Sequence, residues 1–344
     1  SLRLQQILAY ETDLLEFEDI FDGSDVIEAK VDELKEAARE ELKRIDAMGG
    51  AVAAVDSSYM KQQLVISNTE RLKAIETGDQ KLVGVNCYTD TAPSPLTAAE
   101  EGSILTVDES AEKDQIEQLK AWREGRDQAA VDAALATLRE AAQEGRNIMP
   151  PSIEAAKAGV TTGEWGQVLR EVFGEYRAPT GVGRSSRTEG GETTRVQEKV
   201  NRVSNKLGRR IKMLVGKPGL DGHSNGAEQI AVKARDCGME VVYEGIRLTP
   251  AQIVGAALEE GVHVVGLSIL SGSHVALVRD IMERMRDQGL GDIPVVVGGI
   301  IPPEDAEVLK AAGVAAVYTP KDYQLSEIMD AIVDLVDNSF DEAA

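Results

Sequence analysis

From residue 211 onward, short apolar segments alternate with longer segments of helical periodicity. The apolar segments cover residues 211–216, 240–243, 263–268, 294–298 and 315–318, and the helical ones cover 226–237, 250–260, 274–288, 303–312 and 324–336. Short apolar runs of this kind are typical of strands buried on both faces of a parallel sheet. Because connections between parallel strands are right-handed, we expect a flavodoxin-like (Rossmann-like) α/β domain. Its five-stranded parallel sheet should have the order 2-1-3-4-5 and helices on both faces.

The loop after the first of these strands, Lys217–Gly226, carries the sequence Lys-Pro-Gly-Leu-Asp-Gly-His-Ser-Asn-Gly. Open α/β sheets bind their ligands at the carboxyl ends of the strands, where this loop lies. His223 stands two residues after Asp221, so its imidazole can point outward while the carboxylate fixes its tautomer. Metal-ligating histidines are usually held in this way. The alternative is an ordinary turn, since Asp-Gly is a common turn signal.

Two further loops belong to the same edge of the predicted sheet. The third strand ends in Ser268–Gly272, which is small and hydroxylated, and the fourth ends in Gly298-Gly299. Glycines without side chains let a flat ligand approach the backbone closely. Together with the histidine loop, these residues predict a broad, polar-rimmed slot over strands one, three and four.

Two common occupants of this fold do not fit the slot. A flavin or dinucleotide calls for G-x-G-x-x-G after the first strand, and Gly219, Gly222 and Gly226 have a different spacing. A phosphate-receiving domain needs an aspartate at the end of the third strand, where Ser268 stands.

The motif Asp221-x-His223-x-x-Gly226, followed by Ser268-x-Leu270 and by Gly298-Gly299, resembles the signature of base-off, histidine-on cobalamin-binding domains. The resemblance implies that His223 is the lower axial ligand of cobalt and that Asp221 binds the other ring nitrogen of His223. It also implies that Lys217 extends this chain of contacts. The displaced nucleotide tail would lie beside the first strand. The cofactor-binding residues implied by the resemblance are Lys217, Gly219, Asp221, Gly222, His223, Ser224, Gly226, Ser268, Leu270, Ser271, Gly298 and Gly299.

The resemblance extends over the whole chain, which is identified as a member of the methylmalonyl-CoA mutase family. Residues 1–95 resemble the C-terminal part of the acyl-CoA-binding (β/α)8 barrel, with Asp46–Gly50 and Val83–Asn86 as recognisable pieces. Residues 96–194 resemble the helical connector, and 195–344 the cobalamin-binding domain. Within the connector, Thr161 and Glu164 predict a capping box at the start of a helix, and the Gly, Ser, Thr and Arg-rich composition of residues 178–194 predicts a flexible tether. In the barrel part, the residues themselves predict helices around 27–45 and 57–76, a short strand over 82–86 and a linker at 91–95.

Family membership implies an adenosylcobalamin-dependent radical rearrangement of the carbon skeleton of a branched acyl-CoA. The segments Leu4–Asp13 and Lys217–Gly226 are most similar to enzymes that convert ethylmalonyl-CoA to methylsuccinyl-CoA. Methylmalonyl-CoA is the alternative substrate. The chain could also be a non-catalytic corrinoid carrier, but carriers usually place a helical bundle directly before the cobalamin domain, where this chain has a tether. Most of the barrel is absent, so no catalytic residue is assigned. We expect the fragment to be inactive alone. We expect the full-length enzyme to be a homodimer.

Composition excludes several classes of function. The 344 residues hold 37 Lys and Arg against 59 Asp and Glu, giving a net charge of −22, which argues against a nucleic-acid surface. Cys87 and Cys237 are far apart and form no disulfide framework or zinc motif. We see no apolar run long enough for a bilayer and no signal peptide, so we expect a cytoplasmic protein. Because the chain starts at Ser1, we expect it to be cut from a longer protein. His263 and His274 are expected to be structural.

Overall fold

The structure is a computed structural model that describes residues 2–16, 18–90, 109–175 and 191–343. It divides into two compact units, one formed by residues 1–74 with 179–344 and one by residues 75–178. The predicted linker at 91–95 lies outside the described residues, as does most of the predicted tether over 178–194. Within the described ranges, no helix is long and apolar enough to cross a membrane.

The C-terminal part of the chain contains the predicted sheet. Its strands are β1 (Lys212–Gly216), β2 (Glu240–Tyr243), β3 (Val264–Ile269), β4 (Val295–Gly299) and β5 (Ala316–Tyr318). All neighbouring strands pair in parallel, in the order β2-β1-β3-β4-β5. The fold class and strand order predicted from the sequence are therefore confirmed, and the carboxyl ends of β1, β3 and β4 lie next to one another.

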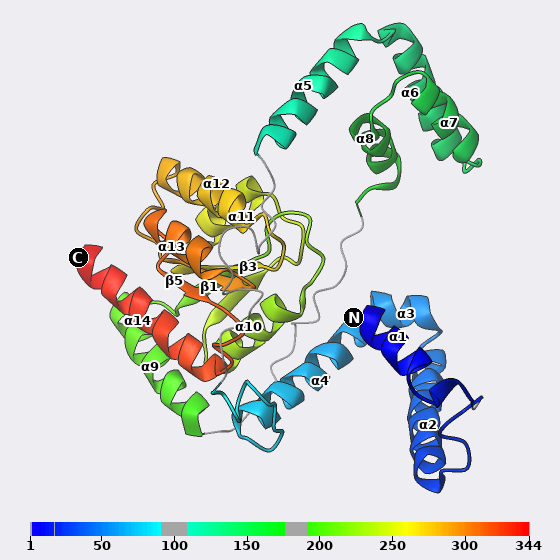
Figure 1. The fold of residues 1–344 in the computed structure, drawn as a ribbon. Coiled ribbons are helices and arrows are strands. Elements are labelled where there is room, and N and C mark those ends of the chain that lie inside the picture. Colours follow the sequence, from blue (N-terminus) through cyan, green and yellow to red (C-terminus); the bar gives the residue numbers. More distant parts are fainter. Residues whose placement is uncertain (1, 17, 91–108, 176–190, 344) are drawn as a thin grey trace. The chain divides into compact units, whose positions relative to one another are not determined.

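Helices cover both faces of this sheet (Figure 1). They are α10 (Asn225–Asp236), α11 (Pro250–Glu260), α12 (His274–Asp287), α13 (Pro303–Ala311) and α14 (Leu325–Ala343). One buried apolar cluster joins α10 and α14 to the sheet, and a second joins α11, α12 and α13 to its other face. Central strands thus bury side chains on both sides, which explains their continuous apolar sequences.

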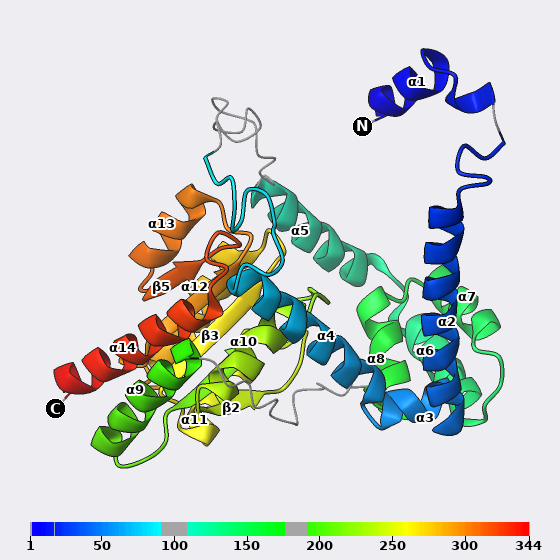
Figure 2. The same cartoon turned by 90° about the horizontal axis from the view of Figure 1, so that it is seen from below.

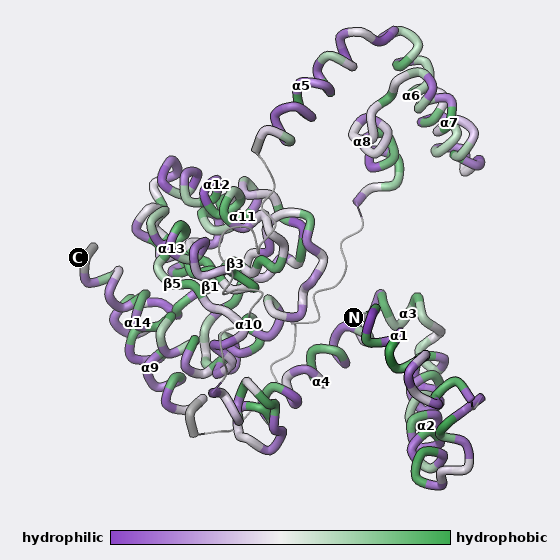
Figure 3. The backbone as a smooth tube through the Cα atoms, in the orientation of Figure 1, coloured by the Kyte–Doolittle hydropathy of each residue, from purple (hydrophilic) through white to green (hydrophobic). Residues whose placement is uncertain are grey.

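An additional helix, α9 (Gly191–Leu207), lies along α14 (Figures 1 and 2). Val196, Val200 and Val203 of α9 are buried in the cluster shared with α14. Both helices alternate hydrophobic and hydrophilic residues along their length (Figure 3). On the outside, Lys199 binds Asp334 at 2.7 Å and Lys206 binds Asp337 at 2.7 Å. Because α9 begins at Gly191, the prediction of a tether was wrong for residues 191–194, which form its first turn.

The N-terminal segment is helical, as predicted. It contains α1 (Leu2–Tyr10), a short 3-10 helix (Leu14–Glu16), α2 (Asp25–Ala47), α3 (Ala51–Asp56) and α4 (Tyr59–Glu76). The prediction of a strand over residues 82–86 is wrong. Val83 and Cys87 form an isolated bridge around a turn, in which Gly84 has a φ of +80° and the Asn86 side chain accepts from the Leu82 amide at 2.7 Å. An asparagine that bonds its neighbours' backbone favours a turn over a strand.

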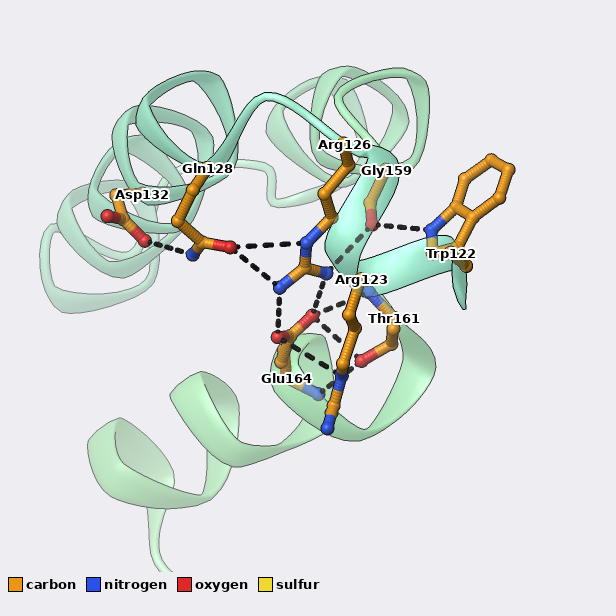
Figure 4. Close-up of polar contacts among 8 residues, drawn as sticks. All are labelled: Trp122, Arg123, Arg126, Gln128, Asp132, Gly159, Thr161 and Glu164. Carbon is orange, nitrogen blue, oxygen red and sulfur yellow. Dashed lines mark hydrogen bonds and ion pairs between the residues drawn. The ribbon is translucent and has the colours of Figure 1, made fainter. Parts of the chain in front are cut away.

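The second unit contains α5 (Glu109–Gly125), α6 (Gln128–Gln143), α7 (Met149–Lys157) and α8 (Thr162–Phe173). The predicted capping box is present: Thr161 and Glu164 cap the start of α8 reciprocally. Glu164 also accepts two hydrogen bonds from Arg126, at 2.6 and 2.7 Å (Figure 4). The carbonyl of Gly159 accepts from both Arg126 and the indole of Trp122, each at 3.0 Å. One carboxylate therefore ties the end of α5 to the start of α8.

This arrangement changes the acidity of Glu164. Its pKa is lowered to about 2, chiefly by the hydrogen bonds from Arg126, with partial burial opposing and Thr161 assisting. The ordinary value is 4.5. Since the pKa is lowered by folding, the stabilisation is complete above the ordinary value and is lost as the pH falls towards 2.

We therefore expect Glu164→Gln to destabilise this unit at pH 7 by about 1–2 kcal/mol, allowing for solvent screening of a partly exposed pair. The difference from the unsubstituted chain should shrink below about pH 4. Both tryptophans of the chain, Trp122 and Trp165, belong to this unit, so tryptophan fluorescence during urea unfolding reports on it selectively. The control is Glu171→Gln, which removes an exposed partner of Arg139. Equal destabilisation by both variants would contradict the central role of Glu164.

Candidate functional site at the carboxyl edge of the sheet

The loop after β1 is fixed by the segment that precedes α11. Gly219 donates its amide to the Leu248 carbonyl at 3.0 Å, and Leu248 donates to the Lys217 carbonyl at 3.1 Å. Gly219 has a φ of +81°, and a Cβ there would lie 2.8 Å from the Leu277 side chain. The positive φ favours glycine at this position, and any other residue would also displace the Leu277 methyl group. The chain is thereby turned back so that residues 221–223 lie over the end of the sheet.

Three charged or titratable side chains of this loop form a chain of contacts. The ammonium nitrogen of Lys217 lies 2.7 Å from Oδ2 of Asp221, and Oδ1 of Asp221 lies 2.7 Å from Nδ1 of His223. The side chains of Lys217 and Asp221 are 1 % and 4 % exposed, whereas that of His223 is 76 % exposed. We call these three residues the relay. It runs from the buried end of β1 to an imidazole at the surface.

The carboxylate in the centre of the relay receives further donors. Asp221 accepts from the backbone amides of His223 at 2.9 Å and Leu270 at 3.1 Å. Burial alone would raise the pKa of Asp221, but the hydrogen bonds from Lys217, from His223 and from the Leu270 amide outweigh it and hold the pKa well below its usual range. Asp221 is therefore ionised at neutral pH.

An ionised Asp221 determines which ring nitrogen of His223 carries the proton. Nδ1 must donate to the carboxylate, so the neutral ring leaves a lone pair on Nε2. No described residue binds Nε2, and the ring is largely exposed. A neutral imidazole nitrogen whose partner nitrogen is bound to a carboxylate has the chemistry of a transition-metal ligand. His223, oriented by Asp221, therefore has the chemistry expected of an axial ligand of cobalt.

The other two parts of the motif meet this loop. Ser268 of β3 pairs in register with Gly298 of β4. A Cβ on Gly226, at the start of α10, would lie 3.7 Å from the hydroxyl of Ser268. Lys217 also donates to the Ser268 carbonyl at 3.3 Å. The structure thus brings the three motif parts together, although they are far apart in the sequence.

The two glycines of β4 have different surroundings. A Cβ on Gly299 would lie 1.8 Å from the Ile269 carbonyl, whereas a Cβ on Gly298 would meet nothing nearer than the Tyr318 carbonyl at 4.0 Å. Gly299 is therefore required for the approach of β4 to β3. The prediction that both glycines leave room for a flat ligand is wrong for Gly299, because the backbone of β3 occupies the space.

The remaining sequence-predicted residues border the relay. Gly222 lies near Arg247, whose side chain would be 3.7 Å from a Cβ there. Ser224 accepts a hydrogen bond from Lys61 of α4 at 2.7 Å, and the hydroxyls of Ser271 and Ser273 are 3.0 Å apart.

Sequence reasoning missed two exposed aliphatic residues on these loops. Leu220 is 90 % exposed and Ile300 is 62 % exposed, on the loops after β1 and β4; Leu270, after β3, is partly exposed. Each of the three loops therefore presents an aliphatic side chain to solvent. Their types alone give no signal, because a leucine or isoleucine after a strand is usually core; only the exposure shows them.

The two other histidines lie outside the relay. His263 precedes β3 at the opposite end of the sheet, where Nδ1 accepts from the Lys212 amide at 2.9 Å. Its pKa is lowered to about 4, first by burial and then by Arg209 and Lys212. His274 is buried at the start of α12 and binds Asp305 at 2.8 Å.

Two family models match parts of this chain. The family model described as methylmalonyl-CoA mutase matches residues 1–175, and the B12 binding domain model matches residues 211–329. The chain belongs to the methylmalonyl-CoA mutase family. The second match includes every residue of the relay and all three parts of the motif.

Within this family, the chain is 62 % identical to ethylmalonyl-CoA mutase of Cereibacter sphaeroides, over 98 % of this chain and 51 % of that protein. It is 57 % identical to ethylmalonyl-CoA mutase of Methylorubrum extorquens, over 100 % of this chain and 50 % of that protein. Methylmalonyl-CoA mutase of Cereibacter sphaeroides is 35 % identical, over 92 % of this chain and 44 % of that protein. The chain spans about half the length of these relatives.

The contrast between the two glycines of β4 gives a direct test of the site's framework. Gly299→Ala should destabilise the sheet domain by about 3 kcal/mol or more, because β4 must move away from the Ile269 carbonyl. Gly298→Ala, the matched control, should change stability by less than about 1 kcal/mol. Urea unfolding followed by far-UV circular dichroism measures both. Similar values for the two variants would show that β3 and β4 do not approach as closely as described.

Proposed function

We propose that residues 195–344 bind cobalamin in the base-off form, with Nε2 of His223 as the lower axial ligand of cobalt. The observation that carries the proposal is the relay, in which a buried, ionised Asp221 directs the free nitrogen of an exposed imidazole outward. Independent support comes from the B12 binding domain match over residues 211–329. His223 acts as an anchor rather than as an acid or base.

The proposed binding site extends from the relay into the loops around it. Ser268 of β3 lies next to Gly226 at the start of α10 and pairs with Gly298 of β4. These residues offer a small, hydroxylated path for the displaced nucleotide tail at the carboxyl edge of the sheet. Leu220, Leu270 and Ile300 would cover apolar surface of the macrocycle. Gly219 and Gly299 shape the backbone that carries these groups, and Gly222, Ser224 and Ser271 complete the rim.

We further propose that the whole protein is an adenosylcobalamin-dependent mutase that converts ethylmalonyl-CoA to methylsuccinyl-CoA. Identities of 62 % and 57 % to ethylmalonyl-CoA mutases, against 35 % to a methylmalonyl-CoA mutase, support this substrate over methylmalonyl-CoA. The match of residues 1–175 to the mutase family supports an enzyme over a corrinoid carrier. When bound, the cofactor supplies the radical chemistry of the carbon-skeleton rearrangement, while the protein binds it and orients it.

In this proposal, residues 1–95 are the C-terminal part of the acyl-CoA-binding barrel, 96–194 the connector, and 195–344 the cobalamin domain. The limits of the two family matches, 1–175 and 211–329, are compatible with a barrel-side part followed by a cobalamin domain. The full-length enzyme would be a cytoplasmic homodimer.

Replacing His223 by Gln should abolish the imidazole-coordinated form of bound cobalamin, because no other described side chain occupies its position. The visible absorption spectrum of cobalamin titrated with the 344-residue chain measures this. His263→Gln is the matched control, since it removes a histidine at the opposite end of the sheet. Unchanged spectra with the His223 variant would overturn the proposed ligand.

Asp221→Asn should weaken cobalamin binding about 10- to 100-fold, the usual effect of losing the partner of a metal-bound histidine. The apo protein should also become less stable, because Lys217 then stays buried without its carboxylate. The titration is therefore made at a temperature where circular dichroism shows the variant fully folded. If a folded variant binds cobalamin as tightly as the original, Asp221 only shapes a turn.

The substrate is tested with the full-length protein, adenosylcobalamin and both acyl-CoA esters. We expect turnover of ethylmalonyl-CoA at a rate well above that of methylmalonyl-CoA, and none by the 344-residue chain alone. Preferred turnover of methylmalonyl-CoA would contradict the substrate, and cobalamin binding without turnover of either ester would favour the carrier.

A further inference from the structure

His274, which the proposed cobalt site does not use, has both ring nitrogens engaged. It is the first residue of α12, and its side chain is 5 % exposed. Nδ1 lies 3.3 Å from the Ser271 carbonyl oxygen, and Nε2 lies 2.8 Å from Oδ2 of Asp305. Asp305 belongs to the first turn of α13 and is itself 37 % exposed. This imidazole thus bridges two elements that follow β3 and β4.

Both partners of His274 are hydrogen-bond acceptors. A carbonyl oxygen has no proton to give, and neither has an ionised carboxylate, so each ring nitrogen must donate its own hydrogen. Full satisfaction of both contacts requires the imidazolium form, paired with the Asp305 carboxylate. A buried charge is retained where such a pairing exists.

The contacts of the three histidines favour different positions for the ring protons. His223 donates from Nδ1 to Asp221, which leaves Nε2 bare. His263 accepts from the Lys212 amide through Nδ1, so its proton is on Nε2. Both contacts of His274 are hydrogen bonds only when each of its ring nitrogens carries a proton.

The contacts of His274 bear on the relay through one short loop. In the loop of residues 270–273, after β3, the Ser271 carbonyl contacts the imidazole of His274. The same loop donates the Leu270 amide to Oδ2 of Asp221 at 3.1 Å. Asp221 in turn holds the ring of His223. The loop is therefore held on one side by the relay and on the other by His274 and α13.

We propose that His274 is a positioning residue for the cofactor site. Its imidazolium, bound to Asp305, holds the Ser271 carbonyl and so keeps the Leu270 amide on Asp221, which fixes the tautomer and orientation of His223. The effect on cobalamin rests on the proposed function, whereas the effect on His223 is a property of the apo protein.

The apo effect can be read directly, because the chain contains three histidines in all. The 344-residue chain labelled with 15N-histidine should show three imidazoles: His274 with two protonated nitrogens, His223 protonated on Nδ1 and His263 on Nε2. Single substitutions assign each signal. In His274→Phe, which keeps a ring but removes both contacts, the His223 signals should shift towards a mixture of both tautomers.

The matched control is His263→Phe, which removes a second histidine beside β3 at the opposite end of the sheet. A general loss of stability should act in both variants, whereas the proposal requires the His223 tautomer to change in His274→Phe and not in His263→Phe. Asp305→Asn keeps an acceptor for Nε2 of His274 but removes the negative charge that favours a proton on both ring nitrogens, and it should shift His223 in the same direction. It also serves as the test if His274→Phe does not fold.

With cobalamin, His274→Phe should weaken binding about tenfold, the lower end of the range for residues that orient a metal ligand. His263→Phe should leave affinity unchanged, and adding Asp305→Asn to His274→Phe should cause no further loss, since both act on one contact.

The proposal is overturned if His274 carries a single ring proton in the unsubstituted chain. It is also overturned if a folded variant of His274 or Asp305 leaves both the His223 tautomer and cobalamin affinity unchanged. Absence of an imidazole–cobalt bond in the unsubstituted protein would instead refute the proposed function. The apo spectra would still decide the role of His274.

Discussion

The buried ion pair between Lys217 and Asp221 is the interaction on which the rest of the site depends. A lysine that is 1 % exposed at the end of a parallel strand loses its hydration, and the contacts that offset this loss are the Asp221 carboxylate and the Ser268 carbonyl. The same pairing keeps Asp221 ionised in spite of its burial. An ionised Asp221 then determines the proton position on His223. The positive charge of the buried Lys217 thus acts through Asp221 on His223, and leaves Nε2 of His223 free at the surface.

The sheet supplies a rigid support for this chemistry. Its strands are apolar on both faces and contribute backbone positions rather than functional side chains, apart from Ser268. Reactive groups lie on the loops at the carboxyl edge, where parallel strands bring distant parts of the sequence together. Gly299 lets β4 approach β3, and Gly219 turns the loop after β1. Some glycines at this edge are therefore needed for the backbone conformation and for strand packing, in addition to any contact with a ligand.

Much of this arrangement could be predicted from the sequence, because the signals are local. Strand order follows from alternating apolar and helical segments, and the capping box at Thr161 follows from one residue pair. The contact of Asp221 with His223 spans two residues. Other features depend on parts of the chain that meet only after folding. The burial of Lys217 against the Ser268 carbonyl, the clash that forbids a side chain at Gly299, and the bridge from His274 to Asp305 are of this kind. At Val83–Cys87, the apolar residues suggested a strand, but the side chain of Asn86 bonds the local backbone and produces a turn.

The proposed function requires that a histidine nitrogen of this chain, and not the base of the cofactor, binds cobalt. Electron paramagnetic resonance of cob(II)alamin bound to the 344-residue chain tests it most directly, because the axial nitrogen splits the cobalt lines. If His223 is the ligand, that splitting should change from a triplet to a doublet when the protein contains 15N-histidine, and should be lost in the His223→Gln variant. A triplet that is unaffected by 15N-histidine would show that the nitrogen comes from the cofactor's own base, and would contradict the account.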